Sequence, residues 1–173
     1  RRQRQMCIRD RGITIEPDET GTTFEENALI KAETICKASG LPTIADDSGL
    51  CVDALNGGPG VYSARFGGEG LDDKGRYTLL LEMLRGQTDR AAHFHTSIVC
   101  AFPNGDELVC EGECPGTIAF APMGEGGFGY DPVFFVPELR KTFGQLTAEE
   151  KASVSHRGKA LRAFAVALDD YLK

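Results

Sequence analysis

Three segments repeat apolar residues at the spacing of an α-helix. The first begins after Thr23, whose side chain is expected to form a capping box with Glu26, and it ends before Gly40. The second covers residues 72–85, and the third follows a further capping box that begins at Thr147. At about 100° per residue, the apolar arcs consist of Phe24, Ala28, Ala32, Ile35 and Cys36 in the first helix, Tyr77, Leu80, Leu81 and Leu84 in the second, and Leu161, Phe164, Ala165, Leu168 and Leu172 in the third.

The chain between these helices favours strands. LPTIADD and LCVDAL predict two short strands on either side of a turn at Ser48 and Gly49, and the loop NGGPG leads to a short helical segment, VYSARF. AHFHTSIVCAF and ELVCEG predict a hairpin, because the Asn-Gly pair between them favours the positive φ angles of a tight turn. Further strands are expected near GTIAF and at PVFFV. Helices and strands with an antiparallel pair and no repeats predict an α/β fold on a mixed β-sheet.

Composition indicates a single domain and excludes several classes of protein. A chain of 173 residues that is 41% hydrophobic can bury one sizeable core. Its net charge of -7 argues against binding to duplex nucleic acid or to an anionic membrane. No apolar run approaches the roughly 18 residues of a membrane helix, so we expect a cytoplasmic location. The first eleven residues, RRQRQMCIRDR, carry five arginines and no periodic pattern, and we interpret 1–11 as a tail foreign to the domain of residues 12–173.

Cysteine and histidine patterns do not indicate a metal centre. The six cysteines are scattered through apolar segments, which is typical of reduced thiols. Only Cys110 and Cys114 lie close together, and a zinc site would need two further ligands that their neighbourhood lacks. His93 and His95 alternate onto one face of a strand without a third ligand, so we interpret them as strand surface.

The segment IADDSG places two adjacent carboxylates at the end of an apolar run. Neighbouring residues of a strand point to opposite faces, so Asp46 and Asp47 cannot both enter one site unless the chain turns between them. Mg²⁺ needs only one or two carboxylates besides waters and phosphates, and the loop of Glu16, Asp18 and Glu19 offers a second acid. Alternatively, the aspartate pair caps a turn through its side-chain oxygens.

Lys31 departs from the apolar pattern of the first helix. It falls about 20° from Phe24, at the edge of the apolar arc and beside Asn27, where another apolar residue is expected. Its aliphatic stem could cover the arc while the ammonium group reaches solvent. Alternatively, the ammonium group points into a cleft.

The segment GEGGFG matches G-x-G-x-x-G formally, at Gly124, Gly126 and Gly129. A dinucleotide fingerprint must open a helix, whereas Pro132 and the strand-forming PVFFV follow this segment. The segment is therefore a loop that presents Phe128, Tyr130 and Asp131, whose rings could stack on a planar ligand and whose carboxylate could orient it. The alternative is a tight turn whose rings enter the core.

The segment SHRGKAL stands at the predicted start of the last helix. Ser155 precedes His156 and Arg157, and free backbone N–H groups, the helix dipole and a guanidinium group together can bind an anion. Lys151, one turn upstream, adds a positive charge. The alternative is a solvated helix end.

Together, these features describe a site for Mg²⁺, a phosphate chain and a planar base. The chain also resembles the inosine triphosphate pyrophosphatase family, which removes non-canonical purine nucleotides. The resemblance is carried, in this order, by TFEENALIKA, IADDSGLCVDAL, GGPGVYSARF, GGFGYDPVFF and EEKASVSHRGKAL.

The resemblance implies a long mixed β-sheet flanked by helices, two lobes around a nucleotide cleft, and a homodimer. It implies Mg²⁺-dependent hydrolysis of ITP, dITP and XTP to the monophosphate and pyrophosphate. Asp47 would be the general base and a metal ligand, and Asp18 would be the second metal ligand, with Glu19 beside it. The residues expected to bind the nucleotide are Ser48, Lys31, Phe128, Gly129, Tyr130, Asp131, Lys151, His156 and Arg157.

The N-terminal region departs from the family pattern. The family's domain normally opens with a strand and a phosphate-gripping loop of the type T/S-x-N-x-x-K, and RRQRQMCIRDR stands in their place. We therefore expect a domain that lacks its first strand and phosphate loop. Two alternatives stay open: a pyrimidine nucleotide pyrophosphatase like the Maf proteins, and a truncated nucleotide-binding fragment without activity.

Overall fold

Two long strands joined by the predicted Asn-Gly hairpin form the centre of the fold. The structure, a computed structural model, describes residues 14–68 and 70–173. The sheet has the order β2-β1-β3-β4-β5-β6, and every pairing between its described strands is antiparallel. The predicted α/β fold is confirmed, with antiparallel pairings where a mixed sheet was expected. The strands are β1 (Thr43–Val52), β2 (Gly58–Pro59), β3 (Ala91–Ala101), β4 (Glu107–Ile118), β5 (Phe134–Val136) and β6 (Lys141–Thr142).

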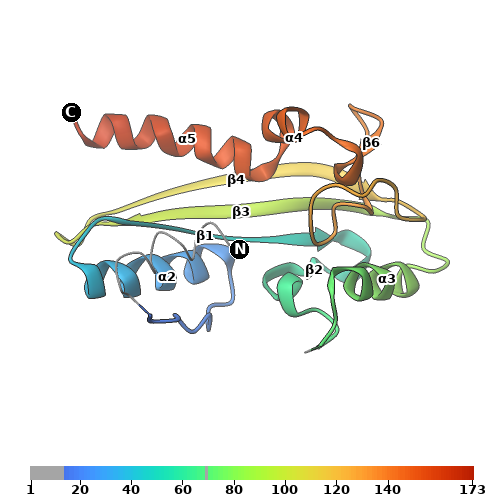
Figure 1. Cartoon of the computed structure of the whole chain (residues 1–173), viewed down its shortest axis with the longest axis horizontal. Helices are drawn as coiled ribbons and strands as arrows, with labels where there is room; N and C mark the ends of the chain where they lie inside the picture. The colour runs from blue at the N-terminus through green and yellow to red at the C-terminus, as the bar shows by residue number, and fades with distance from the viewer. Residues whose placement is uncertain (1–13, 69) are drawn as a thin grey trace.

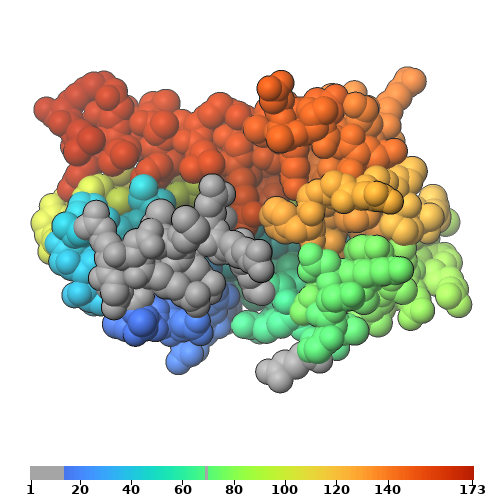
Figure 2. Space-filling view, viewed as in Figure 1, coloured from blue at the N-terminus to red at the C-terminus, as the bar shows by residue number. Residues whose placement is uncertain are grey.

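Helices lie on both sides of the three long strands. In Figure 1, α2 and α3 lie on one side of β1, β3 and β4, and α4 and α5 lie on the other. Figure 2 shows the C-terminal segments as a continuous layer along one long side of the molecule. No helix of the described residues is long and apolar enough to cross a membrane. The helices are α2 (Phe24–Ser39), α3 (Asp73–Met83), α4 (Ala148–Val154) and α5 (His156–Tyr171), with 3-10 segments η1 (Asp53–Leu55), η2 (Gly60–Arg65) and η3 (Phe143–Gln145).

Local capping signals set the helix ends as predicted. Thr23 Oγ1 accepts from Glu26 N (3.1 Å), and the Glu26 carboxylate accepts from Thr23 N (3.3 Å), which completes the capping box of α2. Gly40 ends this helix in the left-handed conformation, at φ 67°. The same box at Thr147 begins α4, so these two predictions are confirmed.

The predicted turn at Ser48 and Gly49 is wrong. Both residues lie inside β1, which pairs with β3 over ten consecutive residues, from Thr43 opposite Ala101 to Val52 opposite Ala92. Gly49 is needed for a close approach instead of a turn. A Cβ atom there would lie 2.7 Å from the Phe24 ring and would collide with the carbonyl oxygen of Gly60 in η2.

The last helix, α5, begins at the predicted segment SHRGKAL, and Phe164 and Leu168 of the predicted stripe lie on its contact face. Ser155 ends α4 and caps α5, accepting from Gly158 N (3.1 Å). His156, Ala160 and Phe164 are buried, whereas Leu161 and Leu172 are exposed. The buried face is the one that contains His156 and Ala160. Gly112 in β4 has no side chain, so the backbone of α5 can approach the sheet closely at these two residues.

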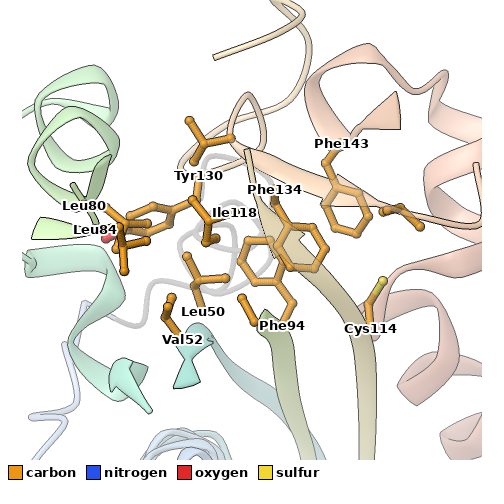
Figure 3. Close-up of a cluster of buried hydrophobic side chains, with 13 residues drawn as sticks. Leu50, Val52, Leu80, Leu84, Phe94, Cys114, Ile118, Tyr130, Phe134 and Phe143 are labelled. Atoms are coloured by element: carbon orange, nitrogen blue, oxygen red, sulfur yellow. The ribbon is translucent and has the colours of Figure 1, made fainter. Parts of the chain in front are cut away.

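The largest core lies at one end of the long strands, where α3, β4 and β5 meet. Figure 3 shows Phe94, Phe134 and Phe143 gathered around the end of the sheet, with Leu80, Leu84 and Tyr130 beside Ile118. Two smaller clusters bury α2 against one face of the sheet and α5 against the other. The strand expected near GTIAF is the final part of β4.

The five cysteines of the described region are free thiols, and Cys7 lies outside it. The predicted N-terminal tail, 1–11, also lies outside the described residues.

Candidate functional site

Asp47 is held from α2 by two side chains one helical turn apart. Lys31 Nζ donates to Asp47 Oδ1 (3.0 Å), and Asn27 Nδ2 donates to Asp47 Oδ2 (3.3 Å). The Asp47 side chain is 12% exposed and that of Lys31 20%. Of the two interpretations of Lys31, the structure supports the ammonium directed at a polar cluster. A lysine that only covered the apolar arc would keep its charge in solvent.

Burial raises the pKa of the Asp47 carboxyl group. Desolvation is the largest cause, the positive charge and hydrogen bond of Lys31 oppose it, and the negative charge of Glu19 adds to it. The result is a carboxylate that binds a proton more readily than an exposed aspartate does. Such a group is suited to accept a proton from water.

The acid that contacts Lys31 beside Asp47 is Glu19, the neighbour of Asp18, which the resemblance suggested as the second metal ligand. Lys31 Nζ donates to Glu19 Oε1 (3.1 Å) as well as to Asp47, so one ammonium group bridges the two carboxylates. Asp18 is exposed, and its backbone carbonyl accepts from Thr20 N (3.0 Å) in a turn. The contact of Glu19 with Lys31 depends on the fold of this loop, so the spacing of the acids in the sequence did not reveal it.

The opposite face of β1 carries a second polar group. Arg157 Nε of α5 donates to Ser48 Oγ (3.2 Å) and lies 3.3 Å from Asp46 Oδ2. Ser48 Oγ also lies 3.3 Å from Asp46 Oδ2 and 2.7 Å from Thr96 Oγ1. The expected division of the doubled aspartate between two faces is thus confirmed, but Asp46 pairs with α5 and does not hold a turn.

Phe128 forms one side of a cationic cluster beyond Arg157. Its ring is 62% exposed, with Lys151 Nζ 4.8 Å and Arg157 Cζ 5.6 Å from its centre. Lys151 Nζ also makes a short hydrogen bond (2.5 Å) to Asp131 Oδ2, which accepts from Phe128 N (2.8 Å). Burial raises the pKa of Asp131 although Lys151 lowers it. The predicted residues Phe128, Asp131, Lys151 and Arg157 are therefore brought together.

Two residues of the glycine-rich loop serve the fold. Tyr130 is 5% exposed, lies in the core (Figure 3), and donates through its hydroxyl to the carbonyl of Ser63 (2.8 Å). It therefore follows the alternative in which a ring enters the core and does not face a ligand. Gly129 takes a φ of 62° and donates its N–H to Asp73 Oδ2 (2.7 Å), which ties the loop to α3.

His156 is a buried, neutral histidine with one unused nitrogen. It is 6% exposed and stacks on Phe94, with ring centres 4.7 Å apart. Burial, with smaller effects from Arg157 and Lys151, lowers the pKa of His156 to about 3. Within the described residues, its Nδ1 atom has no hydrogen-bond partner. Buried nitrogens are nearly always satisfied, so this atom is a candidate for contact with a ligand.

His95 of β3 makes contacts of a different kind. His95 stacks on Phe24, with ring centres 5.1 Å apart, and its nitrogens lie 3.0 Å from Glu113 Oε1 and 3.3 Å from Glu111 Oε1. These contacts occupy both ring nitrogens of His95. In the described part of the chain, no group of three or more His, Cys, Asp and Glu residues is arranged to hold a metal ion.

Sequence reasoning missed the role of Asn27. Its only signal was its position beside Lys31 at the margin of the apolar arc, four residues earlier in the helix. A polar residue at that margin is ordinary at the end of a helix. Its contact with Asp47 depends on how α2 packs on β1.

Comparisons with known proteins assign the chain to a family. The model of the Ham1 family matches residues 3–167. The chain is 52% identical over 158 residues to a dITP/XTP pyrophosphatase of an Exiguobacterium species, covering 91% of this chain and 81% of that protein. It superposes on the Staphylococcus aureus Ham1 protein with a TM-score of 0.88 and 46% identity, covering 91% of this chain and 82% of that one. For a HAM1 protein from Coxiella burnetii, the TM-score is 0.87 at 41% identity, covering 98% and 92%. The family predicted from the motifs is confirmed, and this chain belongs to the Ham1 family.

Proposed function

We propose that this chain hydrolyses dITP, ITP and XTP to the monophosphate and pyrophosphate with Mg²⁺. The observation that carries the proposal is the arrangement around β1: Asp47 faces Lys31 on one side, and Ser48 faces Arg157 on the other. Relatives 52% and 54% identical to the chain bear the name dITP/XTP pyrophosphatase, which supports this substrate class.

The carboxylates near Lys31 fit a Mg²⁺ ion. Mg²⁺ prefers oxygen ligands and is usually bound through one or two carboxylates together with substrate phosphates. Asp47 and Glu19 supply two carboxylates, and Lys31 offsets only one of their negative charges. When bound, the ion would neutralise charge on the phosphates that separate. We assign Glu19 and Asp47 as its protein ligands.

Asp47 is the proposed general base. Its carboxylate takes a proton from the attacking water while the phosphoanhydride bond between the α and β phosphates breaks and pyrophosphate leaves. The hydrogen bonds from Lys31 and Asn27 hold the Asp47 carboxylate in a fixed orientation for this step. Lys31, which already contacts Asp47, can donate to a phosphate oxygen and so hold the chain in line.

The cationic cluster is suited to a base with a 6-oxo group. Phe128 offers an exposed ring for stacking, and Lys151 and Arg157 carry only hydrogen-bond donors. A 6-oxo purine presents an acceptor to these donors, whereas a 6-amino purine presents a donor. The unpartnered nitrogen of His156 adds a further polar contact in a dry environment. A 6-amino group would set a donor against these donors, which disfavours that base.

Pyrophosphate release from dITP tests the proposal, with dTTP and UTP as competing substrates. We expect hydrolysis of dITP that requires Mg²⁺ and falls about 100-fold or more in Asp47→Asn. Asp169→Asn, an exposed change at the end of α5, is the matched control and should retain full activity. A preference for the pyrimidine nucleotides would favour the Maf-like alternative. Absence of release from the folded wild-type protein would indicate a binding fragment.

Two further assignments are proposals, a homodimer from the family resemblance and a cytoplasmic location from the sequence. We propose a homodimer, which light scattering after gel filtration would detect as twice the mass of the chain. We propose a cytoplasmic location, which cell fractionation would test.

A further inference from the structure

Asn27 is a fully buried amide in the first turns of α2. It is 0% exposed, although the neighbouring Glu25 and Glu26 face solvent. Asparagine is a poor helix former, so local propensity does not favour it at this position. A buried amide is costly unless hydrogen bonds satisfy it. The hydrogen bonds of Asn27 must therefore compensate for the burial of its amide.

Asn27 joins the loop before α2 to the carboxylate of Asp47. Its Oδ1 atom accepts from the backbone N–H of Gly21 (2.8 Å), and its Nδ2 atom donates to Asp47 Oδ2 (3.3 Å). The orientation of the amide follows from its partners, because a backbone N–H can only donate and a carboxylate can only accept. Reversing the amide would break both hydrogen bonds.

The same amide also anchors the loop that carries Glu19. Gly21 is two residues from Glu19, and it packs so closely that a Cβ atom would lie 2.7 Å from Glu26 Cβ and 2.8 Å from Asn27 Oδ1. On the other side, Lys31 binds the remaining oxygen of Asp47. Asn27 and Lys31 thus hold both oxygens of the Asp47 carboxylate, and Asn27 also anchors the loop that carries Glu19.

We propose that Asn27 is a positioning residue that sets the Asp47 carboxylate relative to the Glu19 loop. The inference rests on the proposed function, in which these two carboxylates bind the metal ion and Asp47 activates water. Asn27 touches neither water nor substrate in this role. It restricts the rotation of Asp47 and the movement of the loop.

Two variants separate the two contacts. Asn27→Asp keeps an oxygen that can accept from Gly21 N but replaces the donor to Asp47 with a repelling charge. Asn27→Ala removes both contacts. Asn104→Asp is the matched control, because Asn104 Nδ2 donates to Asp106 Oδ2 (2.7 Å) on the exposed hairpin turn, far along the sequence from this site. Thermal unfolding establishes which variants are folded at the assay temperature.

Steady-state kinetics and metal binding are both measured. We expect kcat for dITP to fall about 10–100-fold in both variants, with a smaller change in KM, and Mn²⁺ binding followed by electron paramagnetic resonance to weaken by a similar factor in Asn27→Ala. Asn104→Asp should match the wild type in both measurements. If Asn27→Asp does not fold, Asn27→Ala decides the question.

A folded Asn27→Ala variant with kcat and Mn²⁺ affinity within about threefold of the wild type overturns the inference. A fall in melting temperature without either change assigns Asn27 a purely structural role and also overturns it. The wild-type reaction is a separate measurement. If wild-type protein releases no pyrophosphate from dITP, the proposed function fails, and the Mn²⁺ comparison still decides the role of Asn27.

Discussion

His156 should make the folded state less stable in acid. In the native protein its ring is buried against Phe94, and its pKa falls from 6.5 to about 3, chiefly through desolvation and then through the charges of Arg157 and Lys151. In the unfolded chain the imidazole titrates near its ordinary value. Between these two pKa values the unfolded state binds more protons than the folded state, so stability rises with pH.

The magnitude follows from the two pKa values. Above pH 6.5 the imidazole of His156 is neutral in both the folded and the unfolded state, and it does not lower the free energy of unfolding. As the pH falls from 6.5 toward 3, the unfolded chain binds a proton there and the free energy of unfolding decreases. With pKa values of 6.5 and about 3, the free energy of unfolding at pH 5 is lower than at pH 8 by about 2 kcal/mol from this residue alone. The other titrating groups contribute as well, so the effect must be isolated by comparison.

Urea unfolding of the wild type and of His156→Phe at pH 8 and pH 5 isolates the contribution of His156 to the pH dependence of stability. Phenylalanine keeps an aromatic ring against Phe94 and cannot be protonated. Any constant loss of packing in the variant cancels in the difference between the two pH values. The raised pKa values of Asp47 and Asp131 stabilise the folded state as the pH falls, opposite to His156, and this effect is common to both proteins and cancels as well.

The variant should therefore lose about 2 kcal/mol less than the wild type between pH 8 and pH 5. His95→Gln is the control: it removes an imidazole that stacks on Phe24 beside two glutamates, and its change between the two pH values is compared with that of His156→Phe. If wild type and His156→Phe show the same pH dependence, His156 is not buried in a neutral form and the interpretation is refuted.

Two other changes test the site and the fold. In the proposed function the Lys31 ammonium binds a phosphate, so Lys31→Ala should raise KM for dITP about tenfold or more with a smaller effect on kcat. An unchanged KM in steady-state assays would leave Lys31 without a role in substrate binding. Gly112→Ala should lower the free energy of unfolding by about 1–3 kcal/mol, because the new Cβ would collide with the His156 carbonyl and lie 2.7 Å from Ala160 N. Denaturant unfolding measures this loss, and an unchanged midpoint would show that α5 can move away from β4 at little cost.

The elements that the sequence predicted well are those fixed by neighbouring residues. A capping box needs only Thr23 and Glu26, which are three residues apart, and an Asn-Gly turn needs only the pair at Asn104 and Gly105. Both signals act within one turn of the chain. For that reason both ends of α2, the start of α4 and the turn between β3 and β4 were predicted correctly.

The elements predicted wrongly depend on contacts between distant parts of the chain. Gly49 resembles a turn residue in the sequence, yet it lies mid-strand because Gly60 packs against it from η2. The close approach of α5 at His156 and Ala160 depends on Gly112 of another strand, and no periodicity within the helix reveals that. Tyr130 could equally have faced a ligand, and only the position of the Ser63 carbonyl assigns it to the core.

The candidate site was predictable in composition but not in geometry. Its motifs supplied Asp47, Lys31, Lys151 and Arg157, because charged groups in otherwise apolar or strand-forming segments are visible in sequence. The contact of Lys31 with Glu19 was not visible, because it depends on the conformation of the loop before α2.

The continuous course of β1 explains why two adjacent aspartates are useful. A turn between them would have sent both side chains toward one region, where two buried carboxylates would repel each other. In an uninterrupted strand, alternation sends Asp46 to Arg157 on α5 and Asp47 to Lys31 on α2. One dipeptide thus connects the cationic cluster on one face of the sheet with the carboxylate cluster on the other. Any shift of β1 by one residue would exchange the two partners, so the long pairing with β3 is as necessary to the site as the aspartates themselves.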